Sequence, residues 1–135
     1  MNIEYGLNEV DKVAQKIIEE SRYKIVLFEG NLGAGKTTLI KSLVKALGST
    51  EYVSSPTFSI LNEYQTANGE PIYHMDLYRL KNEHEAFDLG LDEILENDFW
   101  KFIEWPDKIN NLIGSEYHSA KIISTKENIR LLEFS

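Results

Sequence analysis

The sequence predicts an α/β fold in which a mainly parallel sheet is flanked by helices and extended by antiparallel hairpins. Residues 25–28 form an unbroken apolar run, which is typical of a strand buried on both faces of a parallel sheet. A glycine-rich turn and an amphipathic helix follow that strand directly. Strand-forming segments flank Asn68-Gly69, a dipeptide that favours the tight turn of a hairpin.

The remaining elements are predicted from apolar spacing, caps and turn residues. In order, we expect a helix after the N-cap Asn8, a strand at 23–29, a helix at 36–47 closed by Gly48, strands at 58–65 and 71–78, a short helix after Asn82, a strand at 99–104, a short helix begun by Pro106, and a second hairpin formed by 121–124 and 128–134.

Composition limits the class of protein. A chain of 135 residues with 42% hydrophobic side chains is sufficient for one folded domain, which we expect to span residues 1–135. The absence of cysteine excludes disulfides, thiolate metal sites and cysteine nucleophiles. No apolar run is long enough to span a bilayer, and residues 1–5 lack the features of a secretory signal. We therefore expect a cytoplasmic protein without a membrane partner.

Charge argues against direct binding of nucleic acid. The formal net charge is −8, from 22 acidic and 14 basic residues, whereas a nucleic-acid-binding domain needs a basic surface. The chain contains three arginines, which are dispersed at positions 22, 79 and 130. We expect any role with nucleic acid to be indirect.

Residues 30–37 match the phosphate-loop pattern G-x-x-x-x-G-K-[ST], also called Walker A. Its glycines allow successive backbone N–H groups to surround phosphate, Lys36 adds a positive charge at the β- and γ-phosphates, and the Thr37 hydroxyl can bind Mg²⁺. The loop predicts a P-loop NTPase fold that binds a nucleoside triphosphate together with Mg²⁺. The residues expected to contact the nucleotide are Asn31, Leu32, Gly33, Ala34, Gly35, Lys36, Thr37 and Thr38.

Two carboxylates lie at or near the carboxyl ends of predicted strands, at the edge where α/β proteins bind ligands. Asp76 could hold Mg²⁺ through water, opposite Thr37, or could equally cap the strand or face solvent. Glu104 could orient or deprotonate the attacking water, or serve as a second carboxylate beside the metal, or be a loop residue. Thr57 is placed like a switch threonine that senses the γ-phosphate, or could be a threonine that begins a strand.

Three further residues near these strands have more than one interpretation. Trp105 could stack on the base or ribose, contact a partner, or belong to the core. Arg79 could reach phosphate or a partner carboxylate, or be solvated. His74 is predicted to be structural, because no further ligand stands at zinc spacing.

The order of these motifs resembles the TsaE family of small P-loop ATPases. The likeness covers most of residues 23–112, and Asn31 replaces the aspartate that the family usually has. The segments that carry it are G-N-L-G-A-G-K-T-T at 30–38, S-P-T-F at 55–58, Y-H-M-D-L-Y-R-L at 73–80, L-G-L at 89–91 and I-E-W-P at 103–106.

The resemblance implies an ATPase that supports formation of N6-threonylcarbamoyladenosine (t6A) in tRNA. It implies TsaB- and TsaD-like protein partners, with ATP hydrolysis resetting their complex between turnovers. It favours Lys36, Asp76 and Glu104 as catalytic residues, and Thr37, Asp76 and Glu104 as residues at the metal. Because motif arginines are scarce, we expect slow hydrolysis by the chain alone and stimulation by partners.

Two other functions use the same loop. A small-molecule kinase needs an arginine-rich lid and an acceptor pocket, for which three dispersed arginines and 135 residues leave little provision. A nucleotide-gated interaction module without hydrolysis would not need Glu104 as a water-activating carboxylate. Guanine specificity is not excluded by the phosphate loop, but the chain has no clear N-K-x-D pattern.

Overall fold

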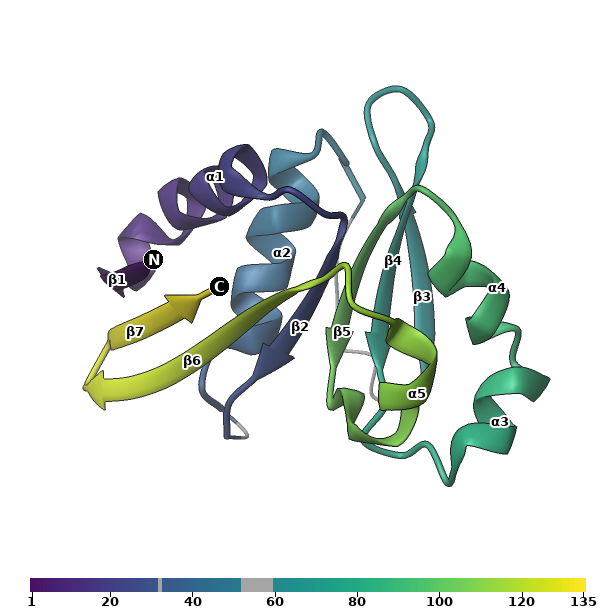
Figure 1. Cartoon of the computed structure of the whole chain (residues 1–135). Helices are drawn as coiled ribbons and strands as arrows, with labels where there is room; N and C mark the ends of the chain where they lie inside the picture. Colours follow the sequence, from purple (N-terminus) through teal and green to yellow (C-terminus); the bar gives the residue numbers. More distant parts are fainter. Residues whose placement is uncertain (32, 52–59) are drawn as a thin grey trace.

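The computed structural model describes residues 1–31, 33–51 and 60–135. Its elements in the described residues are β1 (Asn2–Gly6), η1 (Leu7–Glu9), α1 (Val10–Glu20), β2 (Ile25–Glu29), α2 (Lys36–Ala46), β3 (Leu61–Gln65), β4 (Pro71–Asp76), α3 (Glu83–Asp88), α4 (Leu91–Glu96), β5 (Trp100–Glu104), η2 (Pro106–Ile109), α5 (Asn110–Ile113), β6 (His118–Lys126) and β7 (Ile129–Phe134). Figure 1 shows their arrangement as a central sheet between two groups of helices.

The strands form one sheet in the order β1-β7-β6-β2-β5-β4-β3. The four neighbours β6, β2, β5 and β4 are parallel, whereas β1, β7 and β3 join through antiparallel pairs. Since β1 is antiparallel to β7 and β7 to β6, β1 runs in the same direction as the central four. The predicted α/β fold, with a mainly parallel sheet and hairpin additions, is confirmed.

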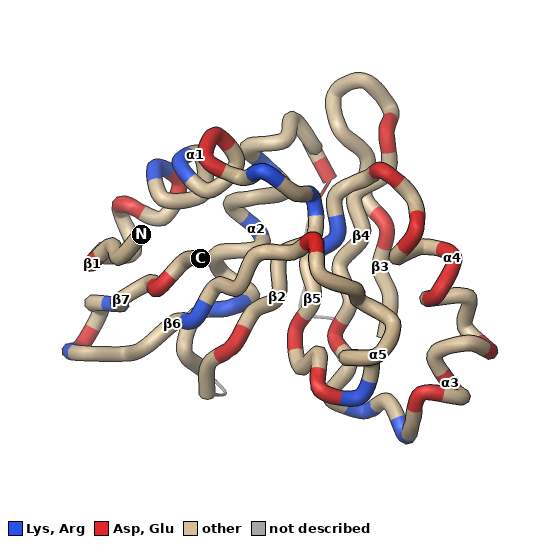
Figure 2. Tube along the Cα trace, in the orientation of Figure 1, with Lys and Arg blue, Asp and Glu red and all other residues tan. Residues whose placement is uncertain are grey.

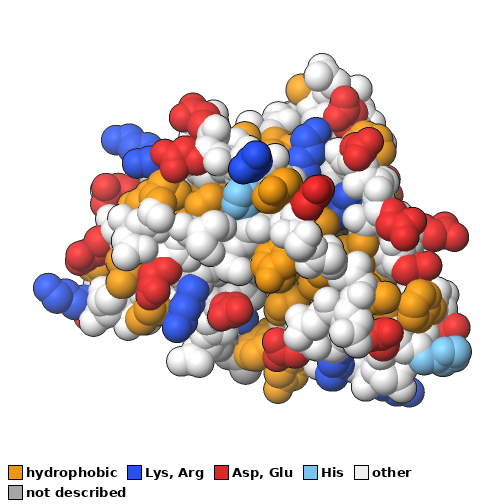
Figure 3. Space-filling view, viewed as in Figure 1, with side chains coloured by type: hydrophobic (Ala, Val, Ile, Leu, Met, Phe, Trp, Pro, Cys, Tyr) orange, Lys and Arg blue, Asp and Glu red, His pale blue; other side chains and the backbone are white. Residues whose placement is uncertain are grey.

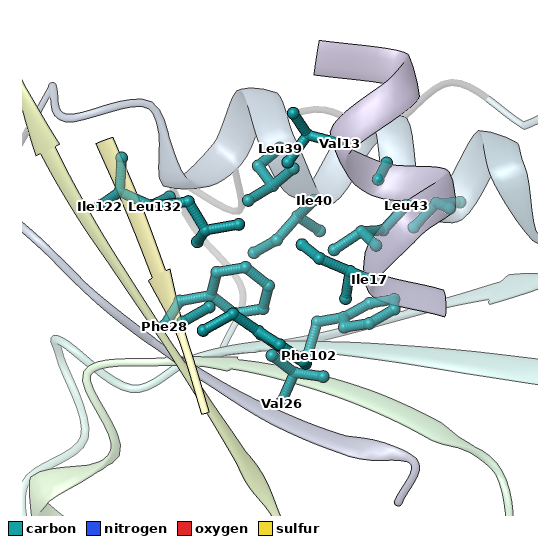
Figure 4. Packing of buried hydrophobic residues seen from close by; sticks show 14 of the residues in the cluster. Val13, Ile17, Val26, Phe28, Leu39, Ile40, Leu43, Phe102, Ile122 and Leu132 are labelled. Atoms are coloured by element: carbon teal, nitrogen blue, oxygen red, sulfur yellow. The ribbon is translucent and has the colours of Figure 1, made fainter. Parts of the chain in front are cut away.

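Helices cover both faces of the sheet and create two cores. One face packs against α1 and α2, and Figure 4 shows Ile17 and Leu43 of these helices against Phe28 and Phe102 of the sheet. The other face packs against α3, α4, η2 and α5. In β2, Val26 and Phe28 belong to the first core and Ile25 and Leu27 to the second. The apolar run therefore forms a strand buried on both faces, as the sequence predicts.

Several local predictions are confirmed. The hairpin of β3 and β4 turns at residues 66–70, and α3 begins after Asn82, whose side-chain Oδ1 accepts a hydrogen bond from the Glu85 backbone N–H at 3.0 Å. Pro106 is the first residue of η2, and Gly48 follows α2 with φ of 91°.

Two local features differ from the predictions. Asn8 is not the N-cap of α1, because it lies inside the 3₁₀ turn η1, and Glu9 occupies the cap position. The Glu9 carboxylate instead accepts a hydrogen bond from the Gly6 backbone N–H at 3.1 Å. The strand β1 was not predicted, and it pairs with β7 at the opposite end of the chain.

None of the helices in the described part of the chain has the length and apolarity that crossing a bilayer requires. Charged side chains of both signs are scattered over the face seen in Figure 3, with acidic groups gathered over α4. Figure 2 shows the same concentration of Asp and Glu along α3 and α4, and neither helix contains Lys or Arg. The negative net charge is therefore unevenly distributed.

Candidate functional site

The phosphate loop joins β2 to α2 at the carboxyl edge of the parallel strands. Gly33 and Gly35 have φ of 81° and 105°, in the left-handed region that favours glycine. The Ala34 backbone N–H donates to the Asn31 carbonyl at 3.0 Å and closes a tight turn. Lys36 is the first residue of α2, so the N-terminal N–H groups of this helix face the end of the loop. Leu32 lies outside the described residues.

Lys36 extends from the helix start into the protein and is 5% exposed. Its Nζ donates to the Gly30 carbonyl at 2.9 Å and lies 3.9 Å from the centroid of the Trp105 ring, over its face. Burial lowers the pKa of Lys36, and the carboxylates of Glu104 and Asp76 oppose that shift. An anion beside Nζ would therefore stabilise the charged form of this lysine.

Asp76 ends β4 and Glu104 ends β5, and the two are direct partners in the parallel register. With Lys36 and Thr37 they line a pocket of about 290 Å³. Its full lining among the described residues is Gly33, Gly35, Lys36, Thr37, Thr38, Asp76, Glu104 and Trp105. Both carboxylates that were predicted at strand ends therefore lie beside the phosphate loop.

The two carboxylates have different surroundings. Glu104 is 3% exposed, and its Oε2 lies 2.7 Å from Nε2 of the fully buried His74. Asp76 is partly exposed, and its Oδ1 accepts a hydrogen bond from the Tyr78 backbone N–H at 3.2 Å. Burial raises the pKa of Asp76, while that backbone bond lowers it. Glu104 is therefore held in one orientation, and Asp76 is more open to the pocket.

His74 was predicted to be structural, and its contact gives it a specific position in this site. It stands two residues before Asp76 on β4, so both side chains lie on the same face of the sheet. Among the described residues, its Nδ1 is a buried atom without a hydrogen-bond partner. The Nε2 atom is the one that meets the Glu104 carboxylate.

The residues present fit a magnesium ion that is shared with phosphate. No cluster of three or more His, Cys, Asp or Glu side chains in the described ranges could hold a metal by itself. Mg²⁺ keeps several waters and commonly takes one or two protein oxygens together with substrate phosphates. Thr37 and Asp76, which line the same pocket as the helix start, supply oxygens of this kind.

Trp105 has a strained backbone, with φ of 55° and ψ of 60° in the left-handed region. Its ring contacts Tyr78 with a centroid distance of 5.2 Å and covers Lys36. Trp105 therefore lies at the phosphate side of the pocket, and its predicted contact with a base stays a prediction. Arg79 is exposed in the segment after β4.

Two of the other predicted site residues line a neighbouring pocket, and a third lies outside the described residues. Asn31 and Ala34 line a second pocket of about 420 Å³ between the loop and β6. Thr57, the predicted switch residue, lies outside the described residues. The functional roles assigned to all these residues stay predictions.

Sequence reasoning did not identify Arg130, which contacts the phosphate loop. It lies on β7, and its Nε donates to the Ala34 carbonyl at 2.8 Å. Its place on a strand is readable from the sequence, but the loop that it meets is almost a hundred residues away. The scarcity of arginine was the one signal that could have drawn attention to it.

The parallel strand, glycine-rich loop and following helix, with a buried lysine at the helix start, define a P-loop nucleotide-binding protein. A family model described as "Threonylcarbamoyl adenosine biosynthesis protein TsaE" matches residues 6–132. The chain belongs to the TsaE family.

Similar proteins support this assignment. Proteins named "tRNA threonylcarbamoyladenosine biosynthesis protein TsaE" from Bacillus subtilis, Rickettsia felis and Synechocystis are 44%, 40% and 34% identical to this chain. The alignments cover 82%, 79% and 78% of this chain, and 68%, 62% and 69% of the relatives. The crystal structure of YdiB from Bacillus subtilis matches 99% of this chain and 84% of its own, with a TM-score of 0.72 and 29% identity.

Proposed function

We propose that the chain hydrolyses Mg-ATP to ADP and phosphate in support of t6A formation in tRNA. The observation that carries the proposal is the pairing of Asp76 with Glu104 beside Lys36 and Thr37 in one pocket. Phosphoryl transfer needs cations at the phosphates, a carboxylate at the metal and a group that positions water, and these four residues can supply them. The names of the relatives support a role for the chain in t6A modification of tRNA.

Each side chain has a distinct part in the proposed reaction. The loop N–H groups and Lys36 bind the β- and γ-phosphates, and Thr37 with Asp76 would hold the metal. When bound, Mg²⁺ supplies charge neutralisation at the phosphate oxygens. Glu104 orients a water whose oxygen bonds to the γ-phosphorus, while the bond to the β–γ bridging oxygen breaks. His74 holds the Glu104 carboxylate at 2.7 Å and so limits its rotation.

The held carboxylate favours hydrolysis over a gated interaction module. Glu104 is buried and fixed toward the pocket, an arrangement that phosphate binding alone does not require. Among the described residues that line this pocket, Lys36 is the single positively charged side chain. A site with so little positive charge supports slow turnover by the chain alone and stimulation by a partner that supplies the missing charge.

The proposed partners are TsaB- and TsaD-like proteins, with tRNA contacted indirectly. The acidic helices α3 and α4 would repel the phosphate backbone of tRNA, which supports a role through protein contacts. A role in tRNA modification supports a cytoplasmic location for the proposed activity.

The test is phosphate release from Mg-ATP, measured for the chain alone and with the TsaB- and TsaD-like proteins of the same organism. We expect strong stimulation by the partners and a loss of about 100-fold or more in Glu104→Gln, because a positioned general base typically contributes about 10²–10⁴-fold. Glu116→Gln removes an exposed carboxylate far from the loop and should leave the rate unchanged. Lys36→Ala should lose nucleotide binding while it stays folded.

Two results would contradict the proposal. Nucleotide binding without hydrolysis, even with both partners, would indicate a nucleotide-gated module. Absence of nucleotide binding by the wild-type chain would show that the loop is not a nucleotide site.

A further inference from the structure

The C-terminal hairpin of β6 and β7 packs directly against the phosphate loop. A side chain at Gly30 would place its Cβ 2.8 Å from the Ile122 carbonyl oxygen, which real contacts do not allow. The pocket of about 420 Å³ beside this contact is lined by loop residues and by residues 121–124 of β6. The shape of the loop therefore depends on a hairpin about ninety residues further along the chain.

Arg130 makes the polar contact across this boundary. Its Nε donates to the Ala34 carbonyl at 2.8 Å, and its Nη1 donates to the Ile129 carbonyl at 3.1 Å. Its strand partner Tyr5 is buried; burial raises the pKa of that tyrosine, and the Arg130 charge opposes the rise. These contacts hold the guanidinium between β1, β7 and the outer side of the loop. The outer side is the side that faces the hairpin of β6 and β7.

The bond to Ala34 fixes more than one carbonyl. The Ala34 C=O and the Gly35 N–H belong to one planar trans peptide unit, so they point in opposite directions. Gly35 lines the pocket with Lys36, and its φ of 105° is one that glycine adopts without strain but also leaves readily. A donor that holds the carbonyl on the outer side therefore directs the Gly35 N–H to the side where phosphate would bind.

We propose that Arg130 is a positioning residue for binding nucleoside di- and triphosphates. Its hydrogen bond sets the Ala34–Gly35 peptide before the nucleotide arrives, so binding does not have to order that unit. The inference rests on the proposed function in one respect, that the loop binds a nucleotide polyphosphate. Because the same N–H group serves bound substrate and transition state, its loss should raise KM and leave kcat little changed.

Two substitutions separate the hydrogen bond from the charge. Gln places its Nε2 donor at the same point of the side chain as the arginine Nε, whereas Met has similar length and no donor. With Mg-ADP and calorimetry on the full chain, Arg130→Met should bind about tenfold more weakly, and Arg130→Gln should stay within about threefold of wild type. Lys126→Met removes a positive charge from an exposed position on the same hairpin and should bind like wild type.

The outcomes are distinct. Equal binding by wild type and a folded Arg130→Met variant would overturn the proposal, and so would equal losses in the Met and Gln variants, because charge would then explain the effect. If the wild-type chain itself does not bind Mg-ADP, the proposed function fails.

A measurement on the wild-type chain protects the test from a variant that does not fold. NMR of the nucleotide-free protein should show the Arg130 Nε–H protected from solvent exchange, because it is bonded to the loop. Arg22 and Arg79 are exposed and provide the internal comparison. Exchange at Arg130 as fast as at these two would overturn the preformed contact.

Discussion

At the scale of single residues, two buried lysines lie at opposite ends of the parallel strands. Lys36 lies at the carboxyl edge, where its Nζ meets a carbonyl and an aromatic face that a polyphosphate can supplement. Lys101 lies near the amino end of β5 and is 1% exposed. Its Nζ donates to the carbonyl of Asn97, the residue just after α4. A cation is favourable at the C-terminal end of a helix. Lys36 therefore lines the phosphate-loop pocket, whereas Lys101 contacts the end of a helix.

Lys101 makes stability depend on pH. Burial lowers its pKa to about 8, from 10.5, with Asp98 opposing the shift. Between these values the unfolded chain binds more protons than the folded chain, so the free energy of unfolding rises with pH. Relative to Lys101→Met, the wild type should gain up to about 3 kcal/mol between pH 7 and 10.5, as measured by urea unfolding. A difference that does not change with pH would contradict this assignment.

The sequence reveals site residues when they belong to a local pattern. Lys36 and Thr37 are identified by the loop, and Asp76 and Glu104 by their position at the ends of predicted strands. Arg130 could not be placed in the same way, because strand periodicity gives a face but not the distant loop that packs on it. The bond between His74 and Glu104 likewise depends on the register of two strands that are thirty residues apart.

At the scale of elements, local signals explain which segments were predicted. Asn68-Gly69 lies in the turn between β3 and β4, and the cap at Asn82 marks the start of α3. The strand β1 has no comparable signal, because a segment of five residues becomes a strand only when β7 is beside it. The Asn8 prediction failed because a 3₁₀ turn precedes the helix, which moves the cap position by one residue.

The cap of α3 gives a prediction at this scale. Asn82→Ala removes the acceptor for the Glu85 backbone N–H and should lower the free energy of unfolding by about 1 kcal/mol. Asn82→Ser keeps a capping oxygen and should restore most of that loss. Chemical denaturation of the three proteins measures both effects, and equal stability of the Ala and Ser variants would show that the side-chain bond does not stabilise α3.

At the scale of the whole molecule, the central strands contribute to both cores. Adjacent residues of β5, Phe102 and Ile103, belong to the first and the second core respectively. A loss of packing on either face therefore disturbs a strand that the other face also needs. The candidate site lies where this shared sheet ends, so packing on both faces also positions the strands that carry Asp76 and Glu104.

This sharing supports the prediction that residues 1–135 unfold as one domain. Ile17 of α1 and Ile109 of η2 are fully buried on opposite faces, so Ile→Val at each is the same change in a different core. Each should lower the free energy of unfolding by about 1 kcal/mol, and the double variant by their sum. Far-UV circular dichroism and tryptophan fluorescence should report one shared transition in all three variants. If Ile109→Val shifted one signal and left the other at the wild-type midpoint, the two faces would be separate folding units.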